Sequence, residues 1–233
     1  MFDCLTDAHC HADFTKSSPD GGLDAGMDLC ACACYPEDWK ALRDFSAPKV
    51  KKSFGLHPTR ADMNLLPTID DYLEFASAVG ETGLDERAAD GIPLEQQREV
   101  FDTQLRLADK FRLPAVIHCV GFWGELVKIL KEWAARSPGA KFMLHAAKCS
   151  PEIARELEKI GGYFSFGLRE LNSKKGAACA AAVSPDRILV ETDALPSREI
   201  IFETIGKLAD LRGAGGVELA QSAYVNYFRF YGK

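Results

Sequence analysis

Eight apolar segments alternate with helix-like segments, and this alternation constrains the fold of the 233-residue chain more than any other feature. One of these segments, residues 114–118, carries a continuous apolar run that is typical of a parallel strand buried on both faces. Repeated strand–helix units without a break in composition predict an α/β fold, a single (β/α)8 TIM barrel, with residues 1–233 as one domain. The predicted strands are residues 2–6, 28–35, 50–56, 79–85, 114–118, 141–145, 163–167 and 187–193.

Several helices between the predicted strands have recognisable signals. Apolar residues at helical spacing predict a long helix over residues 94–112. Thr68 is a typical N-cap residue and predicts a helix that ends near Ala78, and Ser150 followed by Pro151 predicts another helix start. A doubly wound open sheet is the alternative architecture, but such sheets normally have fewer strands, and the chain has no G-x-G-x-x-G fingerprint.

The overall charge and the amino terminus limit the classes of partner. The formal net charge is −6 and no basic run is present, so the sequence does not predict a broad nucleic-acid-binding face. It has no leader-peptide pattern and no apolar stretch long enough to span a bilayer, so we expect a cytoplasmic protein without membrane contact. The eight cysteines are then expected to be reduced thiols.

All five histidines lie at the carboxyl ends of predicted strands. His9 and His11 form an H-x-H pair at the end of the first strand, where side chains at i and i+2 point to the same side. Glu81 lies on the fourth strand, and Asp193 ends the eighth. Because the carboxyl ends of the strands meet on one face of a barrel, we expect these side chains to converge there. The histidines that end the third, fifth and sixth strands are His57, His118 and His145.

The types of these side chains fit a site for two divalent metal ions. Four imidazoles and two carboxylates can hold two ions about 3.5–4 Å apart if one group bridges them. Glu81 is well placed to bridge because it offers two oxygens, and Asp193 can bind one ion and accept the proton of the attacking water. This donor set does not select the metal, so Zn, Mn, Mg, Ni and Co all remain open.

Six short motifs, spread over almost the whole chain, contain these residues. They are Asp7-Ala8-His9-Cys10-His11, Gly55-Leu56-His57-Pro58, Gly80-Glu81-Thr82-Gly83-Leu84-Asp85, Pro114-Ala115-Val116-Ile117-His118, Leu144-His145 and Glu191-Thr192-Asp193. Together they resemble the TatD-type metal-dependent hydrolases, a branch of the amidohydrolase superfamily. The resemblance implies a (β/α)8 barrel that acts as a phosphodiesterase, typically a deoxyribonuclease that works from strand ends, so single-stranded DNA ends are an implied substrate.

The resemblance also implies a role for each residue. His9, His11 and Asp193 would hold one metal ion. His118 and His145 would hold the other, with Glu81 as the bridge. His57 matches a family residue that lies near the substrate phosphate, outside the set of metal ligands.

Three loops depart from the family pattern. The family usually has an arginine two residues after the fifth-strand histidine, where this chain has Val120. After the sixth-strand histidine the family tends to have Cys-Phe-Ser-Gly, where this chain has Ala146-Ala147-Lys148-Cys149. The loop after Asp193 is shorter than in the family. The predicted metal ligands are therefore complete, while the part of the site that faces the substrate is altered.

These departures leave two other functions open. One is a hydrolase of the same superfamily that acts on a small-molecule amide, lactone or ester rather than on DNA. The other is a metal-binding protein without catalysis, such as a module that binds a partner. The sequence indicates neither the natural substrate nor the oligomeric state.

Overall fold

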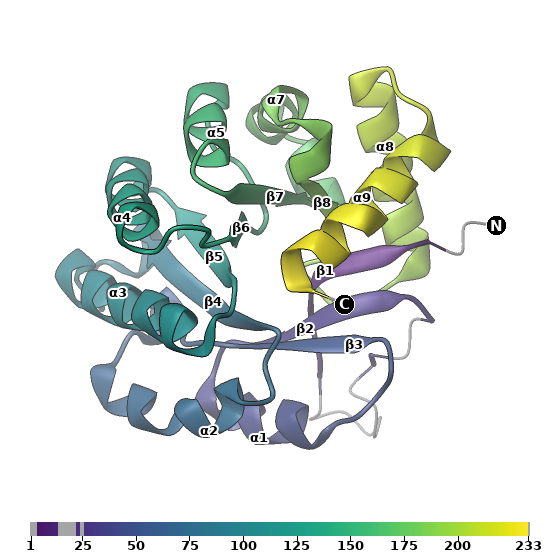
Figure 1. Cartoon of the computed structure of the whole chain (residues 1–233). Coiled ribbons are helices and arrows are strands. Elements are labelled where there is room, and N and C mark those ends of the chain that lie inside the picture. The colour runs from purple at the N-terminus through teal and green to yellow at the C-terminus, as the bar shows by residue number, and fades with distance from the viewer. Residues whose placement is uncertain (1–3, 14–21, 24–25, 233) are drawn as a thin grey trace.

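Eight parallel strands form one sheet in sequential order in the computed structural model, which describes residues 4–13, 22–23 and 26–232 (Figure 1). Each strand is hydrogen-bonded to its neighbours in the chain, and this confirms the predicted (β/α)8 barrel. Residues 2 and 3 of the predicted first strand lie outside the described residues. The strands are β1 (Thr6–His11), β2 (Asp28–Ala33), β3 (Val50–Phe54), β4 (Ala78–Asp85), β5 (Ala115–Val120), β6 (Phe142–Leu144), β7 (Gly162–Phe166) and β8 (Ile188–Val190).

The barrel closes between β1 and the segment that follows β8. The backbone N–H of Asp193 donates to the carbonyl of His9 at 3.1 Å, and the N–H of His11 donates to the carbonyl of Ala194 at 2.9 Å. The Thr192 hydroxyl donates to the buried Asp7 carboxylate at 2.7 Å. Residues at opposite ends of the chain are thereby held side by side.

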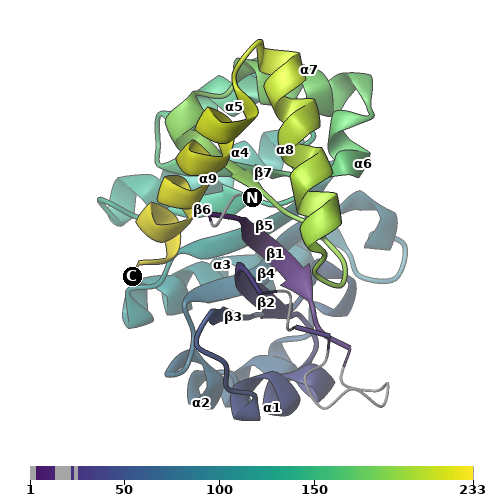
Figure 2. The same ribbon diagram turned by 90° about the vertical axis from the view of Figure 1, so that its right-hand side faces the viewer.

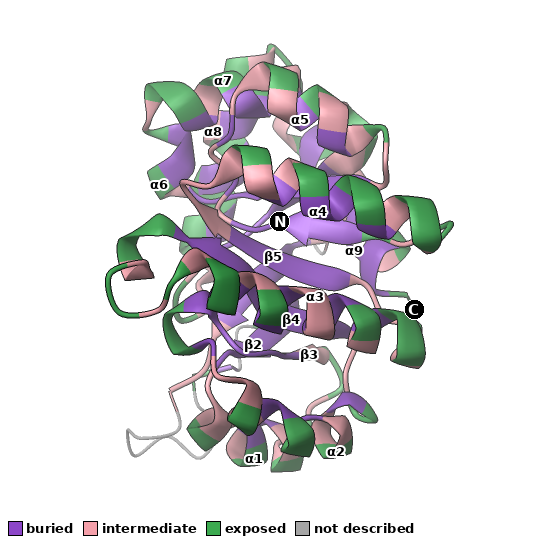
Figure 3. Ribbon diagram, turned by 90° about the vertical axis from the view of Figure 1, so that its left-hand side faces the viewer, coloured by how far each residue is buried: buried purple, intermediate pink, exposed green. Residues whose placement is uncertain are grey.

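The helices cover the outside of the barrel. Figure 3 shows the buried strands β4 and β5 beside α3 and α4, whose outer faces are exposed. Among the described helices, none combines the length and the apolar character that crossing a membrane requires. The helices are α1 (Pro36–Asp44), α2 (Asp70–Leu73), α3 (Leu94–Phe111), α4 (Trp123–Arg136), α5 (Pro151–Glu158), α6 (Leu168–Leu171), α7 (Lys174–Ala182), α8 (Arg198–Arg212) and α9 (Gly216–Tyr231), with 3-10 turns at Pro58–Arg60, Met63–Thr68, Glu86–Ala88 and Pro185–Arg187.

The carboxyl-terminal helix α9 packs against β1 and α8 and fills the amino-terminal end of the barrel (Figure 2). The Tyr231 hydroxyl donates to the carbonyl of Ala8 at 2.7 Å. The aromatic side chains of α9 contact inward-facing residues of the strands and so close the barrel interior from this end. This buried cluster contains Ala8, Cys30, Ala78, Val116, Met143, Tyr163, Leu189, Tyr227, Phe230 and Tyr231.

Most predicted boundaries agree with the structure, but three do not. The first strand, predicted over residues 2–6, is Thr6–His11, so the strand itself contains His9 and His11. The helix predicted to run from Thr68 to near Ala78 is wrong, because only Asp70–Leu73 is α-helical. Ala78 is the first residue of β4 and pairs with β3, so the end of the segment predicted to be helical forms a strand instead. The eighth strand ends at Val190, three residues earlier than predicted, because Thr192 bonds to the side chain of Asp7 instead.

Two buried glutamines on α3 fix the backbone at the ends of β3 and β4. The Gln104 side chain accepts from the N–H of Leu56 at 2.7 Å and donates to the carbonyl of the same residue at 3.0 Å. Gln97 does the same for Asp85, at 2.8 and 3.1 Å. His57 directly follows Leu56, so α3 positions the backbone of two segments that carry polar residues at the open end of the barrel.

Replacing Gln104 with Met removes hydrogen bonds from buried backbone groups while keeping the length of the side chain. We expect the Gln104→Met variant to lose about 1–3 kcal/mol of unfolding free energy, measured by urea denaturation. The exposed Gln221 on α9 gives the control, because Gln221→Met should change stability by less than about 0.5 kcal/mol. Equal losses in the two variants would contradict the role assigned to Gln104.

Candidate metal centre

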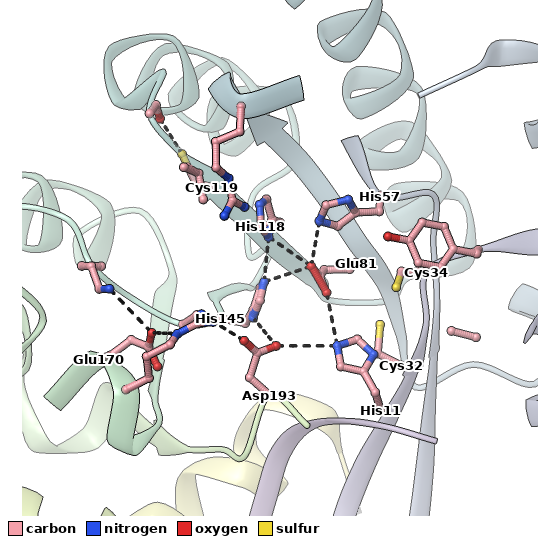
Figure 4. Close-up of a pocket in the computed structure, with 18 of the residues that line it drawn as sticks. His11, Cys32, Cys34, His57, Glu81, His118, Cys119, His145, Glu170 and Asp193 are labelled. Atoms are coloured by element: carbon pink, nitrogen blue, oxygen red, sulfur yellow. Dashed lines mark hydrogen bonds and ion pairs between the residues drawn. The ribbon is translucent and has the colours of Figure 1, made fainter. Parts of the chain in front are cut away.

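A pocket of about 830 Å³ opens at the carboxyl ends of the strands. Figure 4 shows side chains from β1, β4 and the segments after β3, β6 and β8 pointing toward one another there. All five histidines and both predicted carboxylates lie in this cluster, as the sequence analysis expected. His11 is the most open of the histidines, with a side chain that is 33% exposed.

Glu81 is the centre of the cluster, and its first oxygen faces three histidines. Oε1 lies 3.1 Å from Nδ1 of His118, 3.1 Å from Nε2 of His145 and 3.3 Å from Nε2 of His57. The chain approaches β5 so closely before this residue that only glycine fits at position 80, where a Cβ would lie 2.5 Å from the carbonyl of Val116. This close contact between β4 and β5 fixes the backbone position from which the Glu81 side chain enters the pocket.

The second oxygen of Glu81 faces the H-x-H pair on β1. Oε2 lies 3.3 Å from Nε2 of His9 and 3.8 Å from Nε2 of His11. One carboxylate therefore stands between two groups of imidazoles, one on β1 and one formed by His118 on β5 and His145 after β6. That position is what a bridging ligand between two cations requires.

Asp193 faces the same histidines from the segment after β8. Its Oδ1 lies 3.7 Å from Nε2 of His9, 3.6 Å from Nε2 of His11 and 3.7 Å from Nδ1 of His145. The backbone of Asp193 is left-handed, with a φ of 51°, which is a conformation that aspartate tolerates better than most residues. The turn directs the carboxylate toward the histidines of the adjacent strand β1.

Four overlapping groups of described side chains have the spacing to hold a metal ion, and two of them match the predicted ligand sets. His9, His11 and Asp193 form one group, and Glu81, His118 and His145 form the other, with ligand atoms within 4.8 Å of one another in each. Among the described residues, Nε2 of His9 and Nδ1 of His145 are buried without a hydrogen-bond partner, which is costly unless another ligand satisfies them. The nitrogen and oxygen donors and these two unsatisfied atoms fit divalent metal ions.

The acidic and basic side chains of the cluster stabilise one another even without a bound cation. Burial and the neighbouring His145 lower the pKa of His9 to about 4, so its ring is neutral at pH 7. Burial disfavours the charged form of His118, but hydrogen bonds to Asp85 and Glu81 outweigh it and raise the pKa of His118 to about 9. Burial also opposes the ionised form of Glu81, yet the surrounding histidines hold its pKa well below the usual value. Protons and metal ions therefore compete for the same nitrogen atoms.

The sequence analysis missed two residues that contact the ligands. Asp85 Oδ2 lies 3.0 Å from Nε2 of His118 and so turns Nδ1 of that ring toward Glu81. Its spacing of four residues from Glu81 on one strand was the available signal. Cys32 on β2 has metal-ligand spacing with His9 and Glu81.

His57 lies closer to the centre than a residue that only faces substrate. It contacts Glu81 directly, and together with Asp85 and His118 it forms a further group with metal-ligand spacing. Thr59 fixes its ring, because the N–H of Thr59 donates to Nδ1 at 3.2 Å. Nε2 then carries the hydrogen of the neutral ring and points into the pocket.

A protein-family model described as TatD related DNase matches residues 6–232. The chain belongs to this family. A crystal structure of the TatD homolog YjjV from Escherichia coli K12 superposes with a TM-score of 0.84 at 24% identity, and the match covers 100% of both chains. The identity is low, so this likeness supports the fold alone.

Two curated relatives are described by their names as hydrolases. The metal-dependent hydrolase YabD of Bacillus subtilis, itself called uncharacterized, is 35% identical over 149 residues, which are 60% of this chain and 57% of YabD. The human deoxyribonuclease TATDN3 is 27% identical over 221 residues, which are 81% of this chain and 77% of TATDN3. The match to YabD thus spans less than two thirds of that protein, while the match to TATDN3 covers more.

Removing the charge of Asp85 tests its role behind His118. We expect Asp85→Asn to bind Mn²⁺ or Zn²⁺ about 10–100-fold more weakly in isothermal titration calorimetry, because His118 loses the partner that orients it. The control is Asp90→Asn, since Asp90 is exposed in the loop after the same strand and does not line the pocket. Unchanged affinity in Asp85→Asn, with the melting temperature in EDTA preserved, would rule the role out.

Proposed function

We propose that the protein is a metal-dependent phosphodiesterase that cleaves single-stranded nucleic acid from its ends, using two divalent ions. The main support is the arrangement of Glu81 between two histidine groups, with Asp193 facing one of them. Relatives named as nucleases point the same way, among them a 3′-5′ ssDNA/RNA exonuclease TatD from Cronobacter sakazakii, which is 33% identical over half of this chain.

Each residue of the cluster has a role in this proposal. His9, His11 and Asp193 would hold one divalent ion, and His118 and His145 would hold the other. Glu81, whose two oxygens face the two groups, would be shared between the sites. A bound pair of such ions supplies Lewis acidity and lowers the pKa of a coordinated water to near neutrality. The donor set is compatible with Zn, Mn, Mg, Ni or Co, and we assign none of them.

Asp193 accepts the proton of the attacking water. Hydrogen bonding to His11 and the nearby histidines outweigh burial and keep the pKa of Asp193 below its usual value, so the carboxylate is ionised at neutral pH. Its Oδ1 faces the centre, while Oδ2 accepts from Nη2 of Arg169 at 3.2 Å. The two oxygens thus have different tasks, one toward the reacting atoms and one toward the wall of the pocket.

His57 contacts the phosphate of the substrate. Burial lowers the pKa of His57, so the ring is neutral near pH 7. Because Thr59 occupies Nδ1, the ring carries its hydrogen on Nε2, which lies 3.3 Å from Oε1 of Glu81 at the edge of the centre. A neutral N–H donor beside the centre stabilises a non-bridging phosphate oxygen as its charge increases.

Removal and return of metal tests the whole proposal. We expect the protein treated with EDTA to lose activity on a single-stranded oligonucleotide, and added Mn²⁺, Co²⁺ or Zn²⁺ to restore it. Glu81→Ala should abolish activity under all metals because both ions lose a ligand. If metal-loaded protein cleaves amides or lactones but no phosphodiester, the alternative hydrolase function is correct. If metal binds and no substrate of a broad panel turns over, the protein binds metal without catalysis.

His57→Gln separates substrate contact from metal binding. We expect kcat on the oligonucleotide to fall about 10²–10³-fold, as for the loss of one donor that stabilises developing charge. Metal content measured by inductively coupled plasma mass spectrometry should stay equal to that of the wild type. A loss of bound metal in His57→Gln would instead identify His57 as a ligand.

A further inference from the structure

Three cationic side chains lie along one side of the pocket. Lys148 is in the loop after β6, Arg169 is on α6 and Lys175 is in the first turn of α7. The opposite side, after β2, contributes Tyr35 and Asp38 to the lining and no cation. In a chain with a formal net charge of −6, this positive side is a local feature, which we call the cationic rim (Lys148, Arg169 and Lys175).

The buried carboxylate of Glu170 holds two members of the rim. Nε of Arg169 donates to its Oε1 at 2.9 Å, and Nζ of Lys148 lies 3.9 Å from the same oxygen. The Glu170 side chain is only 2% exposed, whereas those of Lys148 and Arg169 are 39% and 71% exposed. Glu170 thus fixes the position of both cations and leaves their outer donors open to the pocket. Figure 4 shows Glu170 beyond Asp193, on the side away from Cys34.

The third member of the rim is held by an aromatic ring. Nζ of Lys175 lies 5.6 Å from the centre of the Trp123 ring, at the start of α4. Trp123 lines the same pocket, so Lys175 is kept at its mouth. Side chains that are already positioned lose less conformational entropy when they bind an anion than free surface lysines do.

The rim begins at the metal centre and leads away from it. Nη2 of Arg169 donates to Oδ2 of Asp193, and the same guanidinium contacts Glu170, which in turn faces Lys148. Val120, where the family resemblance implies an arginine, lines the pocket as an apolar residue. Arg87, after β4, also lines the pocket and is paired with Asp85. The cations of the rim come from the loops after β6 and β7 and not from the loop after β5.

We propose that Lys148 and Lys175, with Arg169 next to the centre, form a subsite for the phosphate adjacent to the scissile one. The subsite makes a single-stranded oligonucleotide a better substrate than a diester that carries one phosphate. This inference rests on the proposed phosphodiesterase function and specifies its substrate. A neutral lactone or amide has no group that would use three tethered cations.

The test compares two substrates with the metal-loaded protein. In Lys148→Met/Lys175→Met, KM for a single-stranded oligonucleotide should rise about tenfold or more, with kcat changed less than about twofold. The slope of log KM against log salt concentration should fall by about 0.7 for each phosphate that the variant no longer neutralises. Cleavage of bis(4-nitrophenyl) phosphate, which has one phosphate, should stay within about twofold of the wild type. Lys128→Met/Lys159→Met, at two exposed positions that do not line the pocket, is the charge-matched control.

The outcomes separate this inference from the proposed function. Equal losses on both substrates, or an unchanged KM and salt slope on the oligonucleotide, would overturn the subsite. If the wild type cleaves neither substrate, the phosphodiesterase proposal fails. Fluorescence anisotropy of a labelled oligonucleotide then still decides, because weaker binding by Lys148→Met/Lys175→Met than by Lys128→Met/Lys159→Met supports the subsite and equal binding overturns it.

Glu170→Gln tests positioning against net charge. The substitution makes the pocket more positive, so an effect of charge alone would lower KM for the oligonucleotide. If Glu170 acts by holding Lys148 and Arg169, KM should rise instead, with bis(4-nitrophenyl) phosphate cleavage retained as evidence of an intact centre. A lower KM would show that the cations do not need the carboxylate to hold them.

Discussion

The hydrogen bonds that join β1 to the segment after β8 are the constraint on which the site depends. They tie the backbone of His9 and His11 to that of Asp193 and Ala194, and Asp7 binds Thr192 across 185 residues of sequence. Without this closure, the first histidine pair and the last carboxylate would lie at two free edges of an open sheet. The same contact that completes the barrel therefore also completes the group of His9, His11 and Asp193, which has metal-ligand spacing.

Glu81 solves a second problem, which is the cost of burying several ionisable groups in one place. An isolated buried carboxylate would take up a proton, and an isolated cluster of histidines would stay neutral. Here the histidines hold the pKa of Glu81 low, while Glu81 and Asp85 hold that of His118 high. These opposite charges keep the ligand atoms facing one another. Two ring nitrogens, Nε2 of His9 and Nδ1 of His145, still lack hydrogen-bond partners. A bound cation would satisfy them and so stabilise the arrangement.

The sequence predicted the parts of the site that depend on strand ends. In a barrel the carboxyl ends must meet on one face, so the positions of five histidines, Glu81 and Asp193 along the chain already implied their convergence. Asp85 was missed because its role depends on the direction of a ring on the neighbouring strand. The wrong helix before β4 has a related cause, since local N-cap signals around Thr68 are weaker than strand pairing at Ala78. Both errors concern tertiary contacts that local patterns do not encode.

The proposed metal ligands and the residues that face the substrate lie on different parts of the barrel. The substrate-facing loops can therefore differ from the family pattern while the ligands are retained. The proposed ligands stand on strands or within three residues of a strand end, where a shift of the backbone would break sheet pairing. The cations of the rim stand on loops and short helices, where substitutions cost little stability. Because all these loops surround one mouth, positive charge absent at Val120 can be supplied by Lys148 or Lys175 from neighbouring units. An altered family motif after one strand is therefore weak evidence against phosphate binding unless the adjacent loops have also lost their cations.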